Sequence, residues 1–432
     1  MSCSPSFCLS SHGLLCNIML LRSHGRFYLA VTLCLLVALL ILSQYVDRFE
    51  SPFRFIASSN PRLVTLDGIA NQTLGFEKVF VINAPWRTDR RDAMTLAASF
   101  HDISFDWIEG VNPQEIRDTA YPPGNHREVT QGARGCWRAH LNALREYAPL
   151  EPVSRSMLIM TRVVAQNLST ALILEDDVDW DFRIRSQLSY FARAARKLPA
   201  LISQANLHSQ ERPPASEEKT LGPVELAKRS SVSLSSTPFR NALDGYPYGC
   251  EWDVLYIGHC GADFPPSSIA HPTRIFQLND ATVPVPGHLR FRSSAPQDAF
   301  ASLYPPHTRL YHRTSNSTLC LHAYAVTQRG ARKILYQFGI RDFSQGFDFA
   351  LSDYCGGNLQ GSQRLMCLTV QPPLLSQYWS TSSGGSDITG TGSSGRMVGS
   401  RYVRWSVRAS LEGPGLSAAR EMGSMADQWP DE

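Results

Sequence analysis

Three features are scarce in this 432-residue sequence, and each scarcity limits what the protein can be. No block of lysine and arginine dominates any stretch, and 41 basic residues nearly balance 38 acidic ones, so nothing favours a nucleic-acid partner. None of the cysteines after residue 46 forms a Cys-x-x-Cys pair, which argues against a zinc site. Residues 1–46 contain no Asp, Glu or Lys, which is the strongest compositional signal in the sequence.

The N-terminal segment is predicted to be a membrane anchor. Residues 27–46 form an almost unbroken apolar run, and crossing a bilayer takes about 20 residues. Arg22 and Arg26 precede this run, which favours a cytosolic tail at 1–26 and a lumenal body. A cleaved signal peptide is the alternative, but no small-x-small cleavage site follows the run. The mixed segment 47–75 is predicted to be a stem.

Six cysteines belong to the predicted lumenal body, and an even number in an oxidising compartment permits up to three disulfides. The sequence does not fix their pairing. The alternative is that some of these cysteines are free buried thiols. These cysteines are Cys136, Cys250, Cys260, Cys320, Cys355 and Cys367.

Apolar strands alternate with helical patterns from residue 76 to residue 380. This order predicts one α/β catalytic domain with a mainly parallel central sheet. Strands are expected at 78–82, 105–108, 171–174, 252–257 and 323–326, and helices at 87–100, 135–147, 182–198 and 328–338.

Three stretches do not fit this alternation. Residues 148–166 and 203–247 are predicted insertions, the second of them flexible because it is rich in Ser, Pro and charge. Residues 381–432 are predicted to be a mostly disordered tail.

The strand at 171–174 leads directly into Glu175-Asp176-Asp177. Ligands of open α/β sheets bind at the carboxyl ends of strands, and clustered carboxylates repel each other unless a cation joins them. Oxygen ligands favour Mg²⁺ or Mn²⁺, which bind substrate phosphates. Because side chains alternate along a strand, Glu175 and Asp177 are the predicted metal ligands, with Asp176 close to the donor. A solvated acidic turn or a helix cap is the alternative.

Two further groups are candidates for binding a phosphate-bearing donor. Asn83 ends the first strand, and Arg87 and Arg90 open the helix after it, where guanidinium groups and a helix N-terminus both suit phosphate. His140 follows a run of small residues and would point back toward the loop before its helix. The alternatives are a capped helix with a solvated basic face and a structural histidine.

Asp348 lies between Phe347 and Phe349. A partly desolvated carboxylate has a raised pKa and can act as a general base, so Asp348 is the candidate catalytic residue. A helix-capping role is the alternative.

In this order, the motifs resemble glycosyltransferase family 25, which includes bacterial lipooligosaccharide and animal collagen galactosyltransferases. The resemblance covers roughly residues 77–380 without the insertions. Gly258-His-Cys-Gly261 and Cys136-Trp137 are most similar to fungal members. The motifs are Val81-Ile-Asn83, Arg87-Thr-Asp-Arg90, Gly135-Cys136, His140-Leu141, Ala171-Leu-Ile-Leu-Glu-Asp-Asp177, Trp252-Asp-Val-Leu-Tyr-Ile-Gly258, His322-Ala-Tyr-Ala-Val326, Gly330-Ala331 and Phe347-Asp348.

The resemblance implies a GT-A-type fold, a UDP-sugar donor, often UDP-galactose, Mn²⁺ (or Mg²⁺), and the lumen of the Golgi or endoplasmic reticulum. By position, residues 175–177 would be the metal and diphosphate motif, residues 83, 87 and 90 would line the donor side, and residue 348 would face the acceptor. Ala84 and Trp86 depart from the family pattern, which often has Leu and a polar or basic residue there.

The function that the resemblance implies is transfer of a hexose, with galactose as the expected sugar, to a hydroxyl of a glycan or glycoprotein, with inversion. The expected topology is that of a single-pass type II membrane protein. A non-catalytic sugar- or nucleotide-binding protein with the same fold is one alternative. A metal-dependent lumenal hydrolase is another, although no His/Asp dinuclear pattern accompanies the acidic run.

Overall fold

The computed structural model describes residues 66–145, 168–207, 220–236, 245–265, 267–289, 302–314, 318–359, 361–380, 398–412 and 425–431. These residues belong to one compact unit, 62–432. The predicted cytosolic tail, the anchor at 27–46 and most of the stem lie outside them, as does the insertion at 148–166. None of the helices in the described ranges is long and apolar enough to span a bilayer.

The described chain alternates strands and α-helices in places, as predicted, but β5 to β7, β8 to β9 and β10 to β12 follow one another with no α-helix between them among the described residues. The helices are α2 (Thr88–Phe100), α3 (Gln131–Leu144), α4 (Ile184–Leu207), α6 (Pro223–Arg229), α8 (Gln328–Tyr336), α9 (Phe347–Gly356) and α10 (Val407–Glu412). The strands are β1 (Lys78–Asn83), β2 (Asp106–Glu109), β3 (Thr170–Glu175), β4 (Val178–Trp180), β5 (Ser231–Ser233), β6 (Val254–Gly258), β7 (Arg274–Gln277), β8 (Arg309–Arg313), β9 (Ala323–Thr327), β10 (Cys367–Gln371), β11 (Leu375–Trp379) and β12 (Gly399–Ser400).

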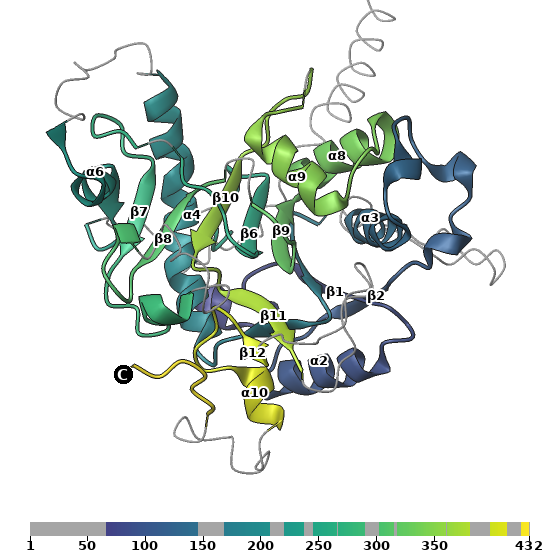
Figure 1. The fold of residues 1–432 in the computed structure, drawn as a ribbon, viewed down its shortest axis with the longest axis horizontal. Helices are drawn as coiled ribbons and strands as arrows, with labels where there is room; N and C mark the ends of the chain where they lie inside the picture. Colours follow the sequence, from purple (N-terminus) through teal and green to yellow (C-terminus); the bar gives the residue numbers. More distant parts are fainter. Residues whose placement is uncertain are drawn as a thin grey trace, which may run out of the picture. The chain divides into compact units, whose positions relative to one another are not determined.

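The large central sheet has the strand order β2-β1-β3-β9-β6-β10-β8-β7-β5 (Figure 1). Strands β9 and β8 are antiparallel to both of their neighbours, and the remaining pairings along this path are parallel. The prediction of an α/β unit with a large central sheet is therefore confirmed, but the sheet is mixed rather than mainly parallel, because β9 and β8 are each inserted antiparallel between two strands. This arrangement brings the carboxyl ends of β1, β3 and β6 to the same edge as the amino end of β9.

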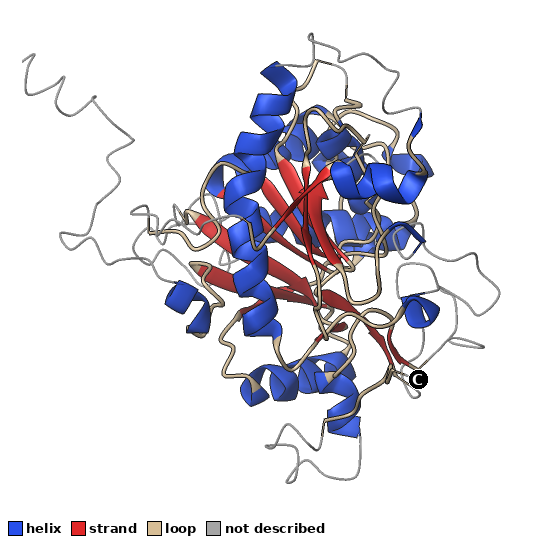
Figure 2. Ribbon diagram, turned by 90° about the vertical axis from the view of Figure 1, so that its left-hand side faces the viewer, coloured by secondary structure: helices blue, strands red, loops and turns tan. Residues whose placement is uncertain are grey.

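Helices cover both faces of this sheet (Figure 2). Along β3, Leu172 and Leu174 belong to one buried cluster, which also contains residues of α2 and α4. Ala171 and Ile173 belong to the other, with residues of α3, α8 and α9. Because successive side chains of a strand point to opposite faces, a sheet buried on both sides needs the continuous apolar runs that the sequence contains.

A smaller group of strands lies against the edge where β3 ends. β4 pairs antiparallel with β11, and β11 pairs with β12 and touches β6 where Leu375 meets Gly258. A side chain at Gly258 would lie 3.0 Å from the carbonyl oxygen of Leu375 and from Ala323. Glycine therefore permits the close approach of β11 that positions the turn between β3 and β4.

Part of the insertion predicted to be flexible is ordered. Within 203–247, α6 and β5 are formed, and β5 pairs in parallel with β7 as the edge strand of the sheet. Its burial is only partial, which explains the polar composition that suggested a flexible loop.

The prediction of a mostly disordered tail also needs correction at residues 398–412 and 425–431. Residues 398–412 form β12 and α10, α10 packs beside α2 (Figure 1), and Asp427 of the second segment pairs with Trp405. Ser406 and Arg408 bond the buried Asp179 and the backbone of Asp176, so the polar composition of 398–412 reflects buried hydrogen bonds rather than solvation.

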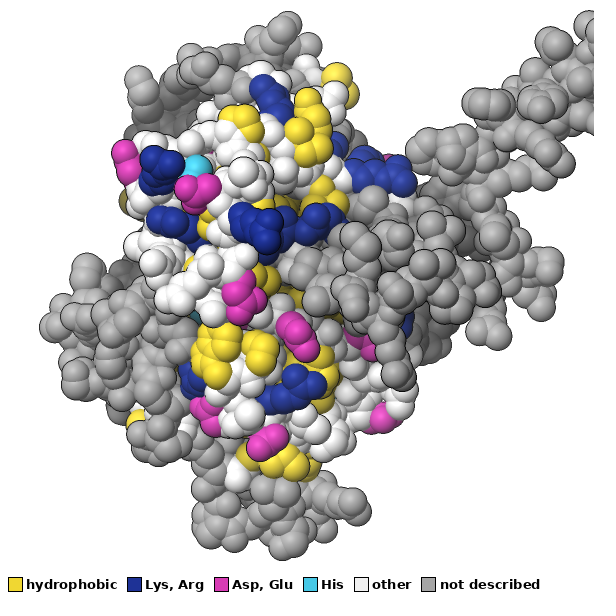
Figure 3. Space-filling view, turned by 90° about the vertical axis from the view of Figure 1, so that its right-hand side faces the viewer, with side chains coloured by type: hydrophobic (Ala, Val, Ile, Leu, Met, Phe, Trp, Pro, Cys, Tyr) yellow, Lys and Arg dark blue, Asp and Glu magenta, His cyan; other side chains and the backbone are white. Residues whose placement is uncertain are grey.

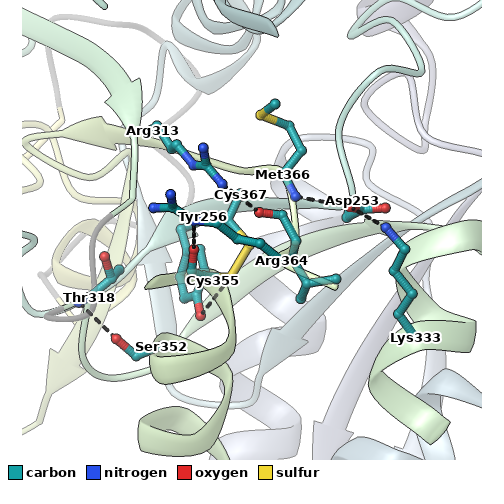
Figure 4. The surroundings of a disulfide bond; sticks show 11 residues. Asp253, Tyr256, Arg313, Thr318, Lys333, Ser352, Cys355, Arg364, Met366 and Cys367 are labelled. Carbon is teal, nitrogen blue, oxygen red and sulfur yellow. Dashed lines mark hydrogen bonds and ion pairs between the residues drawn. A yellow bond between two sulfur atoms is a disulfide. The ribbon is translucent and has the colours of Figure 1, made fainter. Parts of the chain in front are cut away.

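Two disulfides are present in the described part of the chain. Cys260 bonds Cys320, and Cys355 bonds Cys367, which ties α9 to β10 (Figure 4). Cys136 and Cys250 are outside both bridges. Three disulfides were possible, and among the described cysteines two are formed.

Asp253 anchors the start of β6 beside the second disulfide (Figure 4). Its carboxylate accepts hydrogen bonds from the Met366 backbone at 2.9 Å, from Lys333 at 3.0 Å and from Arg329 at 2.8 Å. Burial alone would raise the pKa of Asp253, but these donors outweigh it and lower the pKa. One carboxylate thus joins β6, α8 and the chain entering β10.

The face turned toward the viewer in Figure 3 carries charge of both signs. Lys and Arg side chains gather in a band across its upper half, and Asp and Glu side chains lie both above and below that band. The described part of this face therefore has no single sign of charge.

Candidate functional site

The predicted acidic run forms the tight connection between β3 and β4. Glu175 ends β3, and its backbone N–H donates to the carbonyl of His322 at 2.9 Å. The carbonyl of Asp177 accepts from the backbone of Tyr378 at 2.8 Å. The turn is therefore held between the amino end of β9 and strand β11, at the sheet edge where ligands of α/β proteins bind.

Glu175 lies between two buried histidines. Its Oε1 is 3.5 Å from Nε2 of His140, and its Oε2 is 3.6 Å from Nδ1 of His322. Burial alone would raise the pKa of Glu175, but the two histidines outweigh it and lower the pKa to about 2. The same pairing raises the pKa of His322 against the opposing effect of its burial. Glu175 is thus a carboxylate at neutral pH.

The structure brings Glu175 and Asp177 together, as the alternation along the strand predicted. One ligand atom each from Glu175, Asp177 and His322 lie within 4.8 Å of one another. Oδ1 of Asp177 and Nδ1 of His322 are buried without a hydrogen-bond partner in the described chain. Buried polar atoms are rarely left unpaired, because this costs free energy. The oxygen-rich set therefore fits a divalent cation of the Mn²⁺ or Mg²⁺ type.

Asp176 lies against the end of β1 and the start of α2. It accepts from Nδ2 of Asn83 at 2.7 Å and from Nη1 of Arg90 at 2.9 Å. Burial and the neighbouring Asp177 raise the pKa of Asp176 to about 6, although Arg90 and Asn83 oppose that rise. Three of the predicted donor-side residues therefore lie together, with Asp176 in contact with both Asn83 and Arg90.

The two predicted arginines behave differently. Nη1 of Arg90 contacts Asp176 and also Asp177, the latter at 3.0 Å. Arg87 instead places its guanidinium on Asp89, at 2.7 and 2.9 Å. Arg90 is therefore part of the acidic cluster, whereas Arg87 is joined to it through the backbone, where its carbonyl accepts from Asn83 at 3.1 Å.

His140 is rigidly held on α3. Its Nδ1 is 3.1 Å from the hydroxyl of Tyr324, and its ring stacks on Phe347 with centroids 4.8 Å apart. One turn earlier, a Cβ on Gly135 would lie 2.5 Å from the carbonyl oxygen of Val111, so glycine lets α3 approach the preceding loop closely. The sequence predicted that His140 points toward the loop before its helix, and in the structure its Nε2 lies 3.5 Å from Glu175 of the acidic run.

Asp348 lies in the first turn of α9, half-buried beside this cluster. Its pKa is raised mainly by burial, and the negative charge of Glu175 raises it further. A carboxylate with a raised pKa is a better proton acceptor, which is the property a general base needs.

The C-terminal segment supplies contacts that the sequence did not indicate. Arg408 is buried and donates to the carbonyls of Asp176 at 2.6 Å and Val178 at 3.1 Å. Asp179 accepts from Ser406 Oγ at 2.6 Å, and it also bonds Ser400 Oγ. Burial raises the pKa of Asp179. Residues 398–412 therefore fix the backbone of the acidic turn.

His322 and Cys136 were also missed as site residues. His322 stands in a recognised motif, but its place at the site follows from β9 running antiparallel to β3 and could not be seen without the topology. Cys136 lies one helical turn before His140 on α3, and its thiol sits with His140 and Glu175. That helical spacing was the available signal.

No family model matches the chain. Curated relatives do match part of it. Human procollagen galactosyltransferase 2 is 25% identical over 146 residues, which cover 31% of this chain and 20% of that protein. The mouse protein of the same name is 24% identical over 127 residues, 27% of this chain and 18% of the relative. The human inactive glycosyltransferase 25 family member 3 is 29% identical over 127 residues, 27% of this chain and 19% of the relative.

The matched stretches thus span about a fifth of each relative's length. They support a weak relationship to glycosyltransferase family 25, in agreement with the motifs. These relatives are mammalian and do not support the likeness to fungal members in particular.

Proposed function

We propose that this protein is a metal-dependent glycosyltransferase that moves a hexose, with galactose as the first candidate, from a UDP-sugar to a hydroxyl of a glycan or glycoprotein. The observation that carries the proposal is the cluster of Glu175, Asp177 and His322 at the carboxyl edge of the sheet, with a buried Asp177 oxygen that has no hydrogen-bond partner in the described chain. The partial similarity to procollagen galactosyltransferase 2 adds support. The GT-A-type arrangement belongs to the same proposal.

Glu175, Asp177 and His322 would hold Mn²⁺ or Mg²⁺. Such a cation, when bound to a nucleoside diphosphate, stabilises the negative charge that develops on the leaving group. Asn83 and Arg90 fix Asp176 and thereby the shape of the acidic turn. Arg90 also adds a positive charge beside the cluster, where a diphosphate would lie.

Asp348 is proposed as the general base. Its raised pKa suits it to accept the proton of the acceptor hydroxyl as that oxygen attacks the sugar. Attack on the face opposite the leaving diphosphate inverts the anomeric carbon, so one base and no enzyme nucleophile suffice. His140 and Phe347 pack between α3 and the start of α9 and hold Asp348 in place relative to Glu175.

The proposed location is the lumen of the Golgi or endoplasmic reticulum. Two disulfides in the described chain fit an oxidising compartment, since such bonds are rare in the cytosol. The anchor at residues 27–46 and the type II topology stay predictions of the sequence.

A non-catalytic sugar- or nucleotide-binding protein is the second candidate. Arg90 contacts Asp176 and Asp177, and Gln377 donates to Asp177 at 3.0 Å, so part of the carboxylate surface is already engaged. One relative is itself named an inactive member of the family.

The two candidates differ in turnover. The purified full chain is incubated with Mn²⁺, one UDP-sugar at a time and a panel of glycan and glycopeptide acceptors, and UDP release is measured. A transferase releases UDP with one donor and only when an acceptor is present. UDP-sugar binding with no release under any combination would reject the enzymatic proposal in favour of a binding protein, and release without acceptor would indicate a hydrolase.

A further inference from the structure

A second cluster of metal-ligating side chains lies on the α3 side of Glu175. Sγ of Cys136, a ring nitrogen of His140 and a carboxylate oxygen of Glu175 lie within 4.8 Å of one another. Cys136 and His140 are four residues apart on α3, a spacing that places both side chains on one helix face. This cluster differs from the Glu175-Asp177-His322 set in containing sulfur.

The spacing of these atoms fits tetrahedral coordination. Zn²⁺ bonds to imidazole nitrogen and carboxylate oxygen are about 2.0–2.2 Å long, so two such ligands at a tetrahedral angle are about 3.4 Å apart. Nε2 of His140 and Oε1 of Glu175 are 3.5 Å apart. That separation is long for a direct hydrogen bond and matches two ligands of one ion.

The histidine is also oriented as metal-bound histidines are. Nδ1 of His140 is 3.1 Å from the Tyr324 hydroxyl, and the ring is stacked on Phe347 with an interplanar angle of 4°. A partner on one ring nitrogen fixes the ring and leaves the other nitrogen to the ion. Nε2 is therefore directed at Glu175 and Cys136 by contacts that do not involve either of them.

We propose that Cys136, His140 and Glu175 form a binding site for a thiophilic divalent cation of the Zn²⁺ class, with a fourth position open to water. Thiolate and imidazole select such ions over Mn²⁺ and Mg²⁺, which prefer oxygen. The thiol of Cys136 releases its proton to solvent when the ion binds. This site stands on its own geometry and does not depend on the proposed transfer reaction.

Glu175 belongs to both clusters through different oxygens. Oε1 faces His140, and Oε2 faces His322. The α3-side site and the site with Asp177 therefore compete for, or share, a single carboxylate.

The test uses Co²⁺ as a spectroscopic substitute for Zn²⁺ in the full chain. We expect Co²⁺ binding to produce a near-ultraviolet thiolate-to-cobalt charge-transfer band that Zn²⁺ abolishes by displacement. Cys136→Ser should abolish the band and weaken Zn²⁺ binding by at least the roughly 10- to 100-fold that loss of an outer-shell partner costs. Cys250→Ser, at the exposed cysteine outside both disulfides, is the matched control and should keep the band.

Two further variants separate this site from the oxygen-rich one. Asp177→Asn should keep the charge-transfer band, because Asp177 is not among the three ligands. Tyr324→Phe should weaken Zn²⁺ binding by about 10- to 100-fold without removing a ligand. A band that persists in Cys136→Ser, or Zn²⁺ affinity equal in Cys136→Ser and the unchanged protein, would overturn the proposal.

Discussion

At the scale of single residues, the pKa of each carboxylate in the acidic run depends on the groups that surround it. Glu175 between two histidines has a pKa lowered to about 2, whereas Asp176 next to Asp177 has a pKa raised to about 6. The sequence predicted that these acids cluster at a strand end and that Asn83 and Arg90 lie near them. It could not predict that Arg87 pairs with Asp89, because that contact depends on the turn geometry before α2.

Asp348 should affect turnover more than donor binding. Replacing it by Asn keeps its size but removes the base, so we expect kcat to fall about 10²-fold or more, within the usual range for a general base, while KM for the donor changes little. Steady-state kinetics measure both. Asp353→Asn on the same helix is the control, and an Asp348→Asn variant with the kcat of the unchanged protein would remove Asp348 from the mechanism.

Asp253 should contribute stability that depends on pH. Asp253→Asn should lower the free energy of unfolding by about 2 kcal/mol at pH 7, because three donors lose a charged partner. The pKa of Asp253 is lowered in the folded state, so its contribution is present above the unfolded value of about 3.9 and is lost as the pH falls through the folded pKa.

Urea titrations of Asp253→Asn and the unchanged protein at several pH values test this. The stability difference should shrink below about pH 4. Asp92→Asn, at an exposed position, is the control, and its free energy of unfolding should equal that of the unchanged protein at every pH. A difference for Asp253→Asn that is constant with pH would mean that its charge is not what stabilises the fold.

At the scale of elements, strands with continuous apolar runs were predictable and short partly buried ones were not. The strands expected at 78–82, 171–174 and 323–326 form within one or two residues of their expected ends. β5 and β12 are short and polar, and they are strands only because β7 and β11 offer them backbone partners. Such pairing has no local pattern in the sequence.

The C-terminal segment is the element whose importance the sequence concealed. Arg408→Met should leave the carbonyls of Asp176 and Val178 unpaired, which costs about 1–3 kcal/mol for each buried group. We expect lower stability in urea and, because the acidic turn loosens, weaker Mn²⁺-dependent binding of UDP. Arg341→Met, at an exposed arginine, should change neither. Destabilisation with unaltered UDP binding would show that Arg408 supports the fold and not the site.

At the scale of the whole molecule, the central sheet is buried on both faces, and several elements converge at one of its edges. Strands β1, β3 and β6 end at this edge, and β9 begins there. Helices α3 and α9 flank it, and Arg408 of the C-terminal segment bonds the Val178 carbonyl of β4. The general location of the site followed from the α/β pattern. The contribution of residues far apart in the sequence, such as His322 and Arg408, followed only from the topology.

Ligand binding at this edge should stabilise the entire unit. A ligand that binds only the folded state at a hundred times its Kd adds about 2.7 kcal/mol. We therefore expect Mn²⁺ and UDP together to raise the Tm in a concentration-dependent way, and a chelator to remove the increase. Equal melting with and without the pair would contradict binding to the folded domain.

The central claim is that Asp177 and its neighbours hold a divalent cation that binds a diphosphate. Isothermal titration of UDP into the full chain, with and without Mn²⁺, tests it most directly. We predict measurable UDP binding only with Mn²⁺. Asp177→Asn should lower the affinity about tenfold or more, because one ligand of the ion is removed. Asp106→Asn is the control and should not change the affinity, since its half-exposed carboxylate pairs with Lys78 at the amino end of β2. Binding of UDP that is equal with and without Mn²⁺, or equal in Asp177→Asn and the unchanged protein, would contradict the account.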